Sequence, residues 1–258
     1  MKGCLFLRDY WRCFMRTYKL TIAYDGTRYQ GWQRQSNTDR TIQGILEQTI
    51  SGQIGYDVEV NGSGRTDAGV HAKGQTASVM LPGKTEENFF TEKINEVLPE
   101  DIRILSAKLV KNGFHARKSA VGKTYEYHID TGEKPDVFTR KYAYHFPNDL
   151  DVEKMKEAAR LLAGTHEFAG YTDKRDEKST KRTIYDIIIR RQNNGLVIEY
   201  TGTGFLYHMV RILTGTLLEV GIHQRTPQSV SEALKSKDRA RAGFLAPAKG
   251  LFLRKVYY

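Results

Sequence analysis

Residues 61–72 have the sequence Asn61-Gly62-Ser63-Gly64-Arg65-Thr66-Asp67-Ala68-Gly69-Val70-His71-Ala72. The three glycines, Gly62, Gly64 and Gly69, allow positive φ and close backbone approach, and so leave room around the carboxylate of Asp67. Arg65 lies two positions away; it favours the ionised carboxylate that a nucleophile or base requires, and it can also bind phosphate. A hairpin loop in which Asp67 merely caps its own turn explains the same residues equally well.

Alternating apolar residues predict a sheet on both sides of this loop. Residues 18–24 have the period of a half-buried strand, and further strands are predicted at 56–60, 75–81 and 102–109. One helix is predicted from Thr41 to Gly52. A second begins at Thr85 and ends before Pro99; its predicted buried residues are Phe89, Phe90, Ile94, Val97 and Leu98. In the loop at 27–39, Trp32 either stacks on a base or packs in the core.

The second half of the sequence also mixes strands and helices. Its predicted strands are 123–131, 138–146, 182–191, 196–201 and 251–257. Three helices are predicted there. The first starts at Asp149 or Asp151, the second covers 205–220, and the third starts at Thr226-Pro227. This order predicts the α+β class with a mainly antiparallel sheet. The segments 59–64 and 199–204 both read as a strand running into Gly-x-Gly, which hints at two related halves meeting at a cleft, although a match of six residues can be coincidence.

Composition restricts the partners and the compartment. The 258 residues carry a net charge of +10, which suits a polyanion such as nucleic acid or an anionic membrane surface. No apolar run approaches the roughly 18 residues of a membrane span. The two cysteines, Cys4 and Cys13, are too few for a disulfide framework, which fits a reducing cytoplasm. We expect residues 1–15 to be a disordered N-terminal extension or the result of a start assigned upstream of Met15.

Arg211 is the informative residue of the second half. It falls in the middle of the apolar helix predicted at 205–220, where an unpaired guanidinium would cost several kcal/mol. A carboxylate or bound anion is therefore expected beside it, with Asp67 as the candidate and Glu219 as the architectural alternative. The seven histidines show no metal-ligand spacing, and phosphate-binding glycine motifs are absent from the sequence, so neither a metal nor a nucleotide cofactor is expected.

Five blocks of sequence, in order, resemble the tRNA pseudouridine synthase A family. They are Tyr24-Asp25-Gly26 with Tyr29-Gln30-Gly31-Trp32-Gln33, the block Gly64 to His71, Lys123-Thr124-Tyr125-Glu126-Tyr127, the block Gly204 to Arg211, and Ala246-Pro247-Ala248-Lys249-Gly250-Leu251. The resemblance covers about residues 16–258. It implies isomerisation of uridine to pseudouridine at positions 38, 39 and 40 of the tRNA anticodon stem-loop, without cofactor.

The resemblance also implies an architecture and residue roles. The fold would be that of pseudouridine synthases: two related lobes, residues 16–115 and 116–258, with a continuous, mainly antiparallel sheet across a central cleft. The essential aspartate maps onto Asp67, an active-site tyrosine onto Tyr125, and the arginine that pairs with the aspartate onto Arg211. Arg65 is a further candidate for substrate binding. The family implies a cytoplasmic homodimer in which one tRNA crosses both subunits.

The chemistry agrees with these assignments. Breaking the C1′–N1 bond requires a carboxylate near the sugar or base, and the freed uracil must remain, turn and rejoin through C5 in a dry pocket. The uridine must first flip out of its stack, and Tyr125 can pack against it. Two alternatives stay open: an RNA-binding protein without catalysis, and an N-glycoside hydrolase, for which Glu59 is the only second carboxylate near Asp67 in the sequence. Tyr125 and Tyr127 could also be ordinary strand aromatics.

Overall fold

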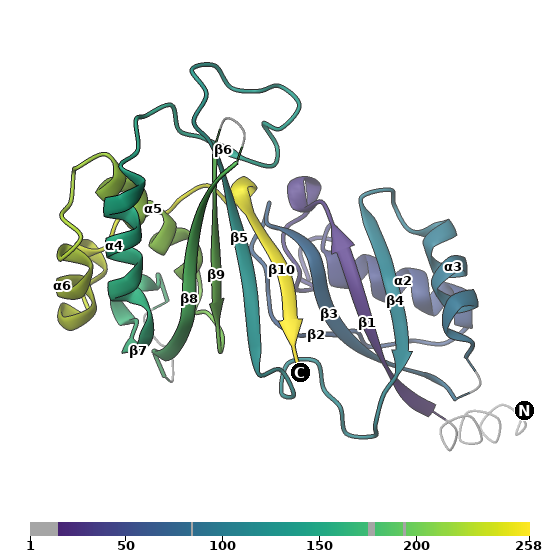
Figure 1. Ribbon diagram of the computed structural model, residues 1–258. Helices are drawn as coiled ribbons and strands as arrows, with labels where there is room; N and C mark the ends of the chain where they lie inside the picture. The colour runs from purple at the N-terminus through teal and green to yellow at the C-terminus, as the bar shows by residue number, and fades with distance from the viewer. Residues whose placement is uncertain (1–14, 84, 175–178, 193–194) are drawn as a thin grey trace, which may run out of the picture. The chain divides into compact units, whose positions relative to one another are not determined.

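The structure is a computed structural model that describes residues 15–83, 85–174, 179–192 and 195–258 (Figure 1). The chain divides into two compact units. The first consists of the residues up to Ala120 together with Tyr258, and the second of Val121–Tyr257. The predicted extension at residues 1–15 lies outside the described residues except for Met15, which is the first residue of a strand.

The sheet of the first unit is built around the strand that the alternating residues predict. β1 (Met15–Tyr24) pairs antiparallel with β3 (His71–Pro82) on one side and β4 (Ile102–Leu109) on the other. The short β2 (Asn61–Gly62) pairs with β3. Tyr18, Leu20, Ile22 and Tyr24 are all buried, as their period of two predicts.

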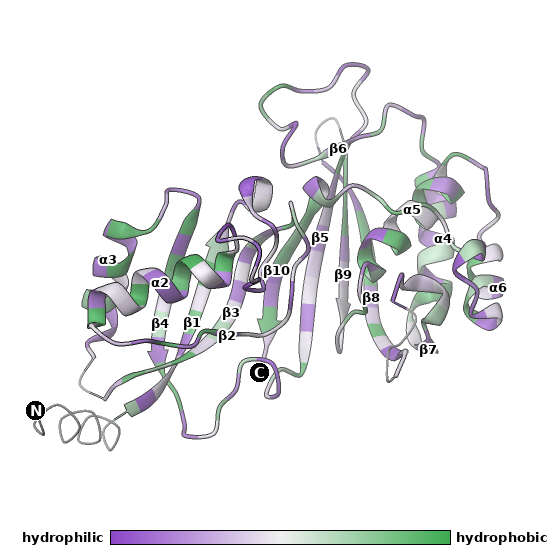
Figure 2. Ribbon diagram, turned by 180° about the vertical axis from the view of Figure 1, so that it is seen from behind, coloured by the Kyte–Doolittle hydropathy of each residue, from purple (hydrophilic) through white to green (hydrophobic). Residues whose placement is uncertain are grey.

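Two helices lie on this sheet (Figure 2). α2 (Ile42–Ile54) begins as predicted, because Thr41 Oγ1 accepts the amide of Gly44, but it ends at Gly55 in the left-handed region (φ 80°), not at Gly52. α3 (Glu87–Val97) is capped by Glu86, not by Thr85. Phe89 and Val97 are exposed, contrary to the prediction. A short 3-10 turn, η1 (Gly26–Arg28), follows β1.

The predicted strand at 56–60 is wrong, and the structure shows why. The amide of Val58 donates to Ser51 Oγ (3.0 Å), and that of Val60 donates to Glu47 Oε1 (3.0 Å). Side chains of α2 thus take the backbone donors that a neighbouring strand would need. The resemblance between 59–64 and 199–204 is therefore not a repeated strand and turn, because 199–202 lies within a strand and 59–60 does not.

The sheet of the second unit has the order β10-β5-β9-β8-β7. Its strands are β5 (Gly122–Asp130), β7 (Gly164–Glu167), β8 (Lys181–Gln192), β9 (Gly195–Gly202) and β10 (Leu251–Tyr257). These five strands pair antiparallel, and β6 (Tyr144–His145) pairs parallel with β5. β8 and β9 form the predicted hairpin, although its turn residues 193–194 lie outside the described residues. The α+β class is confirmed.

The helices of the second unit cover one face of this sheet. α4 (Val152–Leu162) begins after Asp151 as predicted, and it packs against β8 and α5 (Met209–Gly221). α6 (Ser229–Ser236) starts two residues after Thr226-Pro227. The 3-10 turns are η2 (Ala169–Tyr171), η3 (Arg239–Arg241) and η4 (Ala248–Gly250).

The predicted strand at 138–146 is wrong except for Tyr144 and His145. Asp130 accepts the amides of Gly132 and Asp136, and Asp136 in turn accepts the amide of Phe138, so these carboxylates fold the segment into a loop. Phe138 is 85% exposed as a result.

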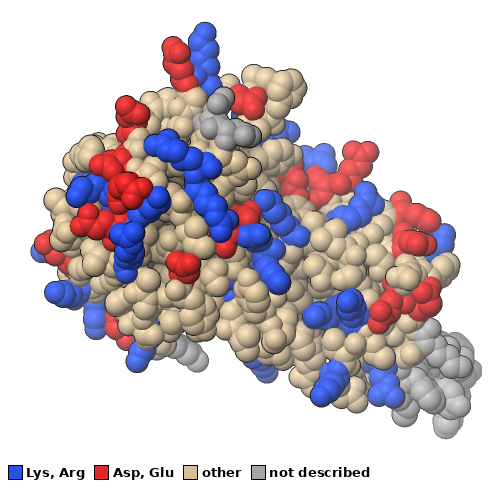
Figure 3. Space-filling model, in the orientation of Figure 1, with Lys and Arg blue, Asp and Glu red and all other residues tan. Residues whose placement is uncertain are grey.

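Charged side chains of both signs are intermingled on the face seen in Figure 3. On the second unit's sheet, Arg254 contacts Glu126 (3.1 Å) and Glu199, and Arg190 lies 3.8 Å from Glu199. These arginines therefore do not form a patch of one sign for a polyanion. Each helix of the described residues is too short or too polar to span a bilayer.

Candidate active site

The Asp67 loop joins β2 to β3 and is held from beneath by a buried tryptophan. Trp32 is 2% exposed, so the core interpretation is correct and base stacking by this ring is excluded. Its amide donates to the carbonyl of Thr66 (3.0 Å), and the Thr66 hydroxyl shares a 2.8 Å hydrogen bond with Tyr24. The residue before Asp67 is thus fixed through both its backbone and its side chain.

Two glycines allow this close packing. A Cβ on Gly31 (φ 89°) would lie 2.6 Å from the carbonyl oxygen of Thr66, and a Cβ on Gly62 would lie 2.4 Å from the indole Nε1 of Trp32. Of the three loop glycines in the sequence prediction, only Gly69 has positive φ (76°). Gly62 is required by the approach of Trp32 instead, which the sequence alone does not reveal.

Gln75 is a supporting residue that the sequence analysis missed. It is fully buried, accepts the hydroxyl of Ser63 (2.7 Å) and donates to the carbonyl of Gly64 (3.1 Å). The sequence does contain a signal for this role, namely a glutamine at an inward-facing position of β3. A side-chain amide that is buried in a strand indicates that it forms hydrogen bonds with backbone or side-chain groups.

Asp67 and Arg65 share this loop but differ in their surroundings. Asp67 is partly exposed, and its backbone carbonyl accepts the amide of Val70 (3.1 Å). Arg65 is exposed and donates from Nε to Gln33 Oε1 (3.1 Å). No ion pair within the described residues joins Arg65 to Asp67. The arrangement presents a carboxylate on a backbone held by hydrogen bonds, with an exposed cation near it in sequence.

In the second unit, Tyr125 and its neighbour Tyr127 have different environments. Tyr127 is fully buried and donates to the carbonyl of Pro247 (2.7 Å); burial raises the pKa of its phenol. Tyr125 is 8% exposed, and the ring of Phe205 meets it edge-on, with centroids 5.3 Å apart. Tyr127 fits the interpretation as a strand aromatic. Phe205 is a candidate base-contacting residue that we did not single out from the sequence, although it lies in the fourth resembling block.

The predicted position of Arg211 in mid-helix is wrong. α5 begins at Met209, so Arg211 is its third residue and is partly exposed. Its Nε donates to the carbonyl of Ala246 (2.7 Å). The alternative partner Glu219 binds Arg225 and the amide of Phe244 (3.1 Å). A cation in the first turn is unfavourable to the helix dipole, so Arg211 is placed here for a reason other than helix stability.

A family model described as tRNA pseudouridine synthase matches residues 20–117 and 158–258, which is more than half of the chain. The chain belongs to the tRNA pseudouridine synthase family. The family resemblance is thereby confirmed. Asp67 and Arg211 lie within the matched ranges of this family, whereas Tyr125 lies in the interval 118–157 between them.

Full-length relatives extend the match across that interval. A tRNA pseudouridine synthase A of Clostridium kluyveri is 44% identical over 245 residues, which cover 95% of this chain and 100% of the relative. Proteins of the same name from Bacillus sp. (strain KSM-64) and Acetivibrio thermocellus are 43% and 42% identical, with the same coverage of both chains.

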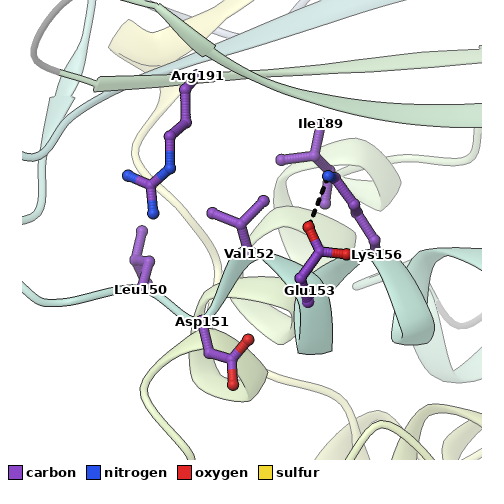
Figure 4. A pocket seen from close by; sticks show the side chains of 7 residues that line it. All are labelled: Leu150, Asp151, Val152, Glu153, Lys156, Ile189 and Arg191. Atoms are coloured by element: carbon purple, nitrogen blue, oxygen red, sulfur yellow. Dashed lines mark hydrogen bonds and ion pairs between the residues drawn. The ribbon is translucent and has the colours of Figure 1, made fainter.

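The second unit of this pseudouridine synthase family member also contains an open pocket of about 560 Å³ between the start of α4 and β8 (Figure 4). Its lining residues are Leu150, Asp151, Val152, Glu153, Lys156, Ile189 and Arg191. None of the four predicted site residues lines it. Glu153 and Lys156 pair with each other (2.8 Å). Among the described residues no group of His, Cys, Asp and Glu is arranged to hold a metal ion.

Proposed function

We propose that this protein converts uridine to pseudouridine at positions 38, 39 and 40 of the tRNA anticodon stem-loop, with Asp67 as the essential carboxylate. Membership of the tRNA pseudouridine synthase family carries the proposal. The backbone of the Asp67 loop, fixed by Trp32 and Tyr24, supports it further, because a reacting carboxylate must be held in a defined place.

The reaction breaks the C1′–N1 bond of uridine and forms a bond from C1′ to C5 of the same uracil. Asp67 either adds to C1′ or removes a sugar proton to give a glycal, and both routes require an ionised carboxylate at the ribose. The C5 proton leaves to solvent after the new bond forms, and N1 takes up a proton, so that the product is an isomer of the substrate. Water must be excluded meanwhile, because hydrolysis would release the uracil.

The other predicted residues take supporting roles in this proposal. Tyr125, with Phe205 against its ring, would pack on the flipped base. Arg211 would pair with Asp67, as the family resemblance implies, and Arg65, which is exposed, would bind a tRNA phosphate. The protein would act in the cytoplasm. It would act as a homodimer, and sedimentation equilibrium tests this oligomeric state.

The decisive experiment replaces Asp67 with asparagine and measures tritium release from tRNA that carries 5-tritiated uridine. Asp67→Asn keeps the side-chain volume, so we expect tRNA binding without tritium release or pseudouridine formation. Asp57→Asn is the matched control, because Asp57 is an exposed aspartate of the same unit, and it should retain full activity. Activity in Asp67→Asn would refute the assigned role. Free uracil from the wild-type protein would indicate the N-glycoside hydrolase instead, and binding without any product would indicate an RNA-binding protein.

A further inference from the structure

The chain immediately before α5 has an unusual backbone conformation. His208, the residue preceding the helix, has φ 61° and ψ −3°, in the left-handed region that residues other than glycine seldom adopt. Phe205 lies three positions before it and Arg211 three positions after it. The conformation of this one residue therefore sets the direction in which α5 starts relative to the Phe205 loop.

Side chains from another segment hold His208 in this conformation. Oδ2 of Asp173 lies 2.6 Å from Nδ1 of His208, and the ring of Tyr207 stacks on the imidazole with centroids 3.7 Å apart. The hydroxyl of Thr172, next to Asp173, donates to the carbonyl of Tyr207 (3.0 Å). Thr172 thus contacts the backbone of Tyr207, and Asp173 contacts the side chain of His208.

The second oxygen of Asp173 fixes the aspartate itself. Nε of Arg239 donates to Oδ1 of Asp173 (2.8 Å), and the same guanidinium donates to the carbonyl of Gly243 (2.9 Å). Burial raises the pKa of the Asp173 carboxyl, but the hydrogen bonds from His208 and Arg239 outweigh it, so the pKa ends below its ordinary value. Asp173 is therefore a carboxylate with both oxygens occupied, joining three chain segments.

The other end of α5 provides a contrast. His223 also has a positive φ (60°), but its side chain is 69% exposed and its ring nitrogen is 3.8 Å from Asp151. At His223 the left-handed backbone therefore goes with an exposed side chain, whereas at His208 it goes with contacts from Asp173 and Tyr207 that fix the ring.

We propose that Asp173 is a positioning residue for pseudouridine formation: by holding His208 in its left-handed conformation, it sets the first turn of α5, with Arg211, and the placement of Phe205 against Tyr125. This inference rests on the proposed function. Asp173 acts through His208 and does not contact the substrate. Its removal should therefore slow the reaction of bound tRNA and leave tRNA affinity nearly unchanged.

The test is a double-mutant cycle between Asp173→Asn and His208→Gly, because glycine adopts the left-handed conformation without support. We expect Asp173→Asn to lower the single-turnover rate of tritium release about 100-fold, the scale expected for a small displacement of reacting groups. Its tRNA dissociation constant should stay within about threefold, since the phosphate contacts remain. In the His208→Gly background, Asp173→Asn should lower the rate less than about threefold, because no backbone support is left to remove. His223→Gly is the matched control and should change neither quantity.

Two outcomes would overturn the inference. An equal loss of rate in both backgrounds would mean that Asp173 does not act through His208. A weakened tRNA affinity with an unchanged rate would mean that Asp173 contributes to RNA binding instead. Thermal unfolding of each variant confirms folding, and Asp173→Ser replaces Asp173→Asn if the latter does not unfold cooperatively. Absence of tritium release from the wild-type protein would refute the proposed function, and this inference with it, whereas failure of the cycle alone leaves the proposed function intact.

Discussion

The Asp67 loop and the segment leading into α5 hold their functional side chains by different physical means. Beneath Asp67 the contacts are neutral and buried, such as the hydrogen bond between Tyr24 and Thr66. Before α5 they are ionic and partly exposed, since the side chains of Asp173 and Arg239 are each 32% exposed. Buried neutral contacts depend on packing, whereas partly exposed ion pairs depend on protonation and salt. The loop should therefore respond to changes in side-chain volume, and the α5 segment to changes in charge.

The largest effect is expected from removing the ring beneath the loop. Trp32→Ala should lower the free energy of unfolding by about 3–5 kcal/mol, because it empties a buried site of aromatic size. Chemical denaturation measures this change. Phe138→Ala removes an aromatic ring that is 85% exposed and should change the free energy of unfolding by less than about 0.5 kcal/mol. A small effect of Trp32→Ala would show that packing does not fix the loop.

A smaller effect is expected from adding a single methyl group against the loop. Gly31→Ala places a Cβ against the carbonyl of Thr66 at positive φ, so it should lower the free energy of unfolding by about 1–3 kcal/mol and reduce activity by displacing Asp67. Gly52→Ala is the matched control within α2, where no atom lies within 4 Å of the new Cβ. It should stabilise the protein by up to about 1 kcal/mol through helix propensity. Comparable stability of the two variants would contradict the close-packing argument.

The smallest effect is expected from pH at the α5 segment. The pKa of Asp173 is lowered in the folded state, so its ionised form contributes stability above the ordinary aspartate pKa, and this contribution is lost as pH falls through the folded-state value. Asp173→Asn should therefore be less stable than wild type at pH 7, by less than about 1 kcal/mol for so exposed a group. The difference should persist down to about pH 4, near the ordinary aspartate pKa, and should disappear only as pH falls through the lower folded-state pKa of Asp173. Urea denaturation at several pH values measures it. For Trp32→Ala we expect a loss of stability that is independent of pH. A pH-dependent loss in Trp32→Ala together with a pH-independent loss in Asp173→Asn would contradict the distinction between the two regions.

Local sequence predicted those elements whose backbone groups bond within the element or to an adjacent strand. β1 follows from its alternation of buried and partly exposed residues, and α4 from an aspartate cap followed by apolar residues at helical spacing. The hairpin of β8 and β9 follows from two alternating runs around a turn signal. The loop position of Asp67 also follows from local sequence, because a carboxylate between glycines is visible there, and its catalytic role stays a prediction.

Predictions failed where side chains accepted hydrogen bonds from backbone amides that a strand would have needed. Glu47 and Ser51 bind the amides of 58–60, so a run with strand composition remains outside the sheet. Asp130 and Asp136 do the same to the aromatic run before β6. Arg211 was misplaced because apolar composition continues through 205–208, whereas the left-handed His208 delays the start of α5. Composition reports how apolar a segment is but not which partner takes its hydrogen bonds.

By itself, then, the sequence determined the α+β class, most strands and helices, the family resemblance and the candidate carboxylate, because these depend on residue type and local spacing. Only the tertiary structure decided that Trp32 supports the loop from within, that Gly62 and Gly31 are needed for contact across the fold, and that Asp173 joins three segments at the start of α5. The physical reason is that close packing and ion pairing are relations between residues far apart in the chain, and local sequence does not contain them.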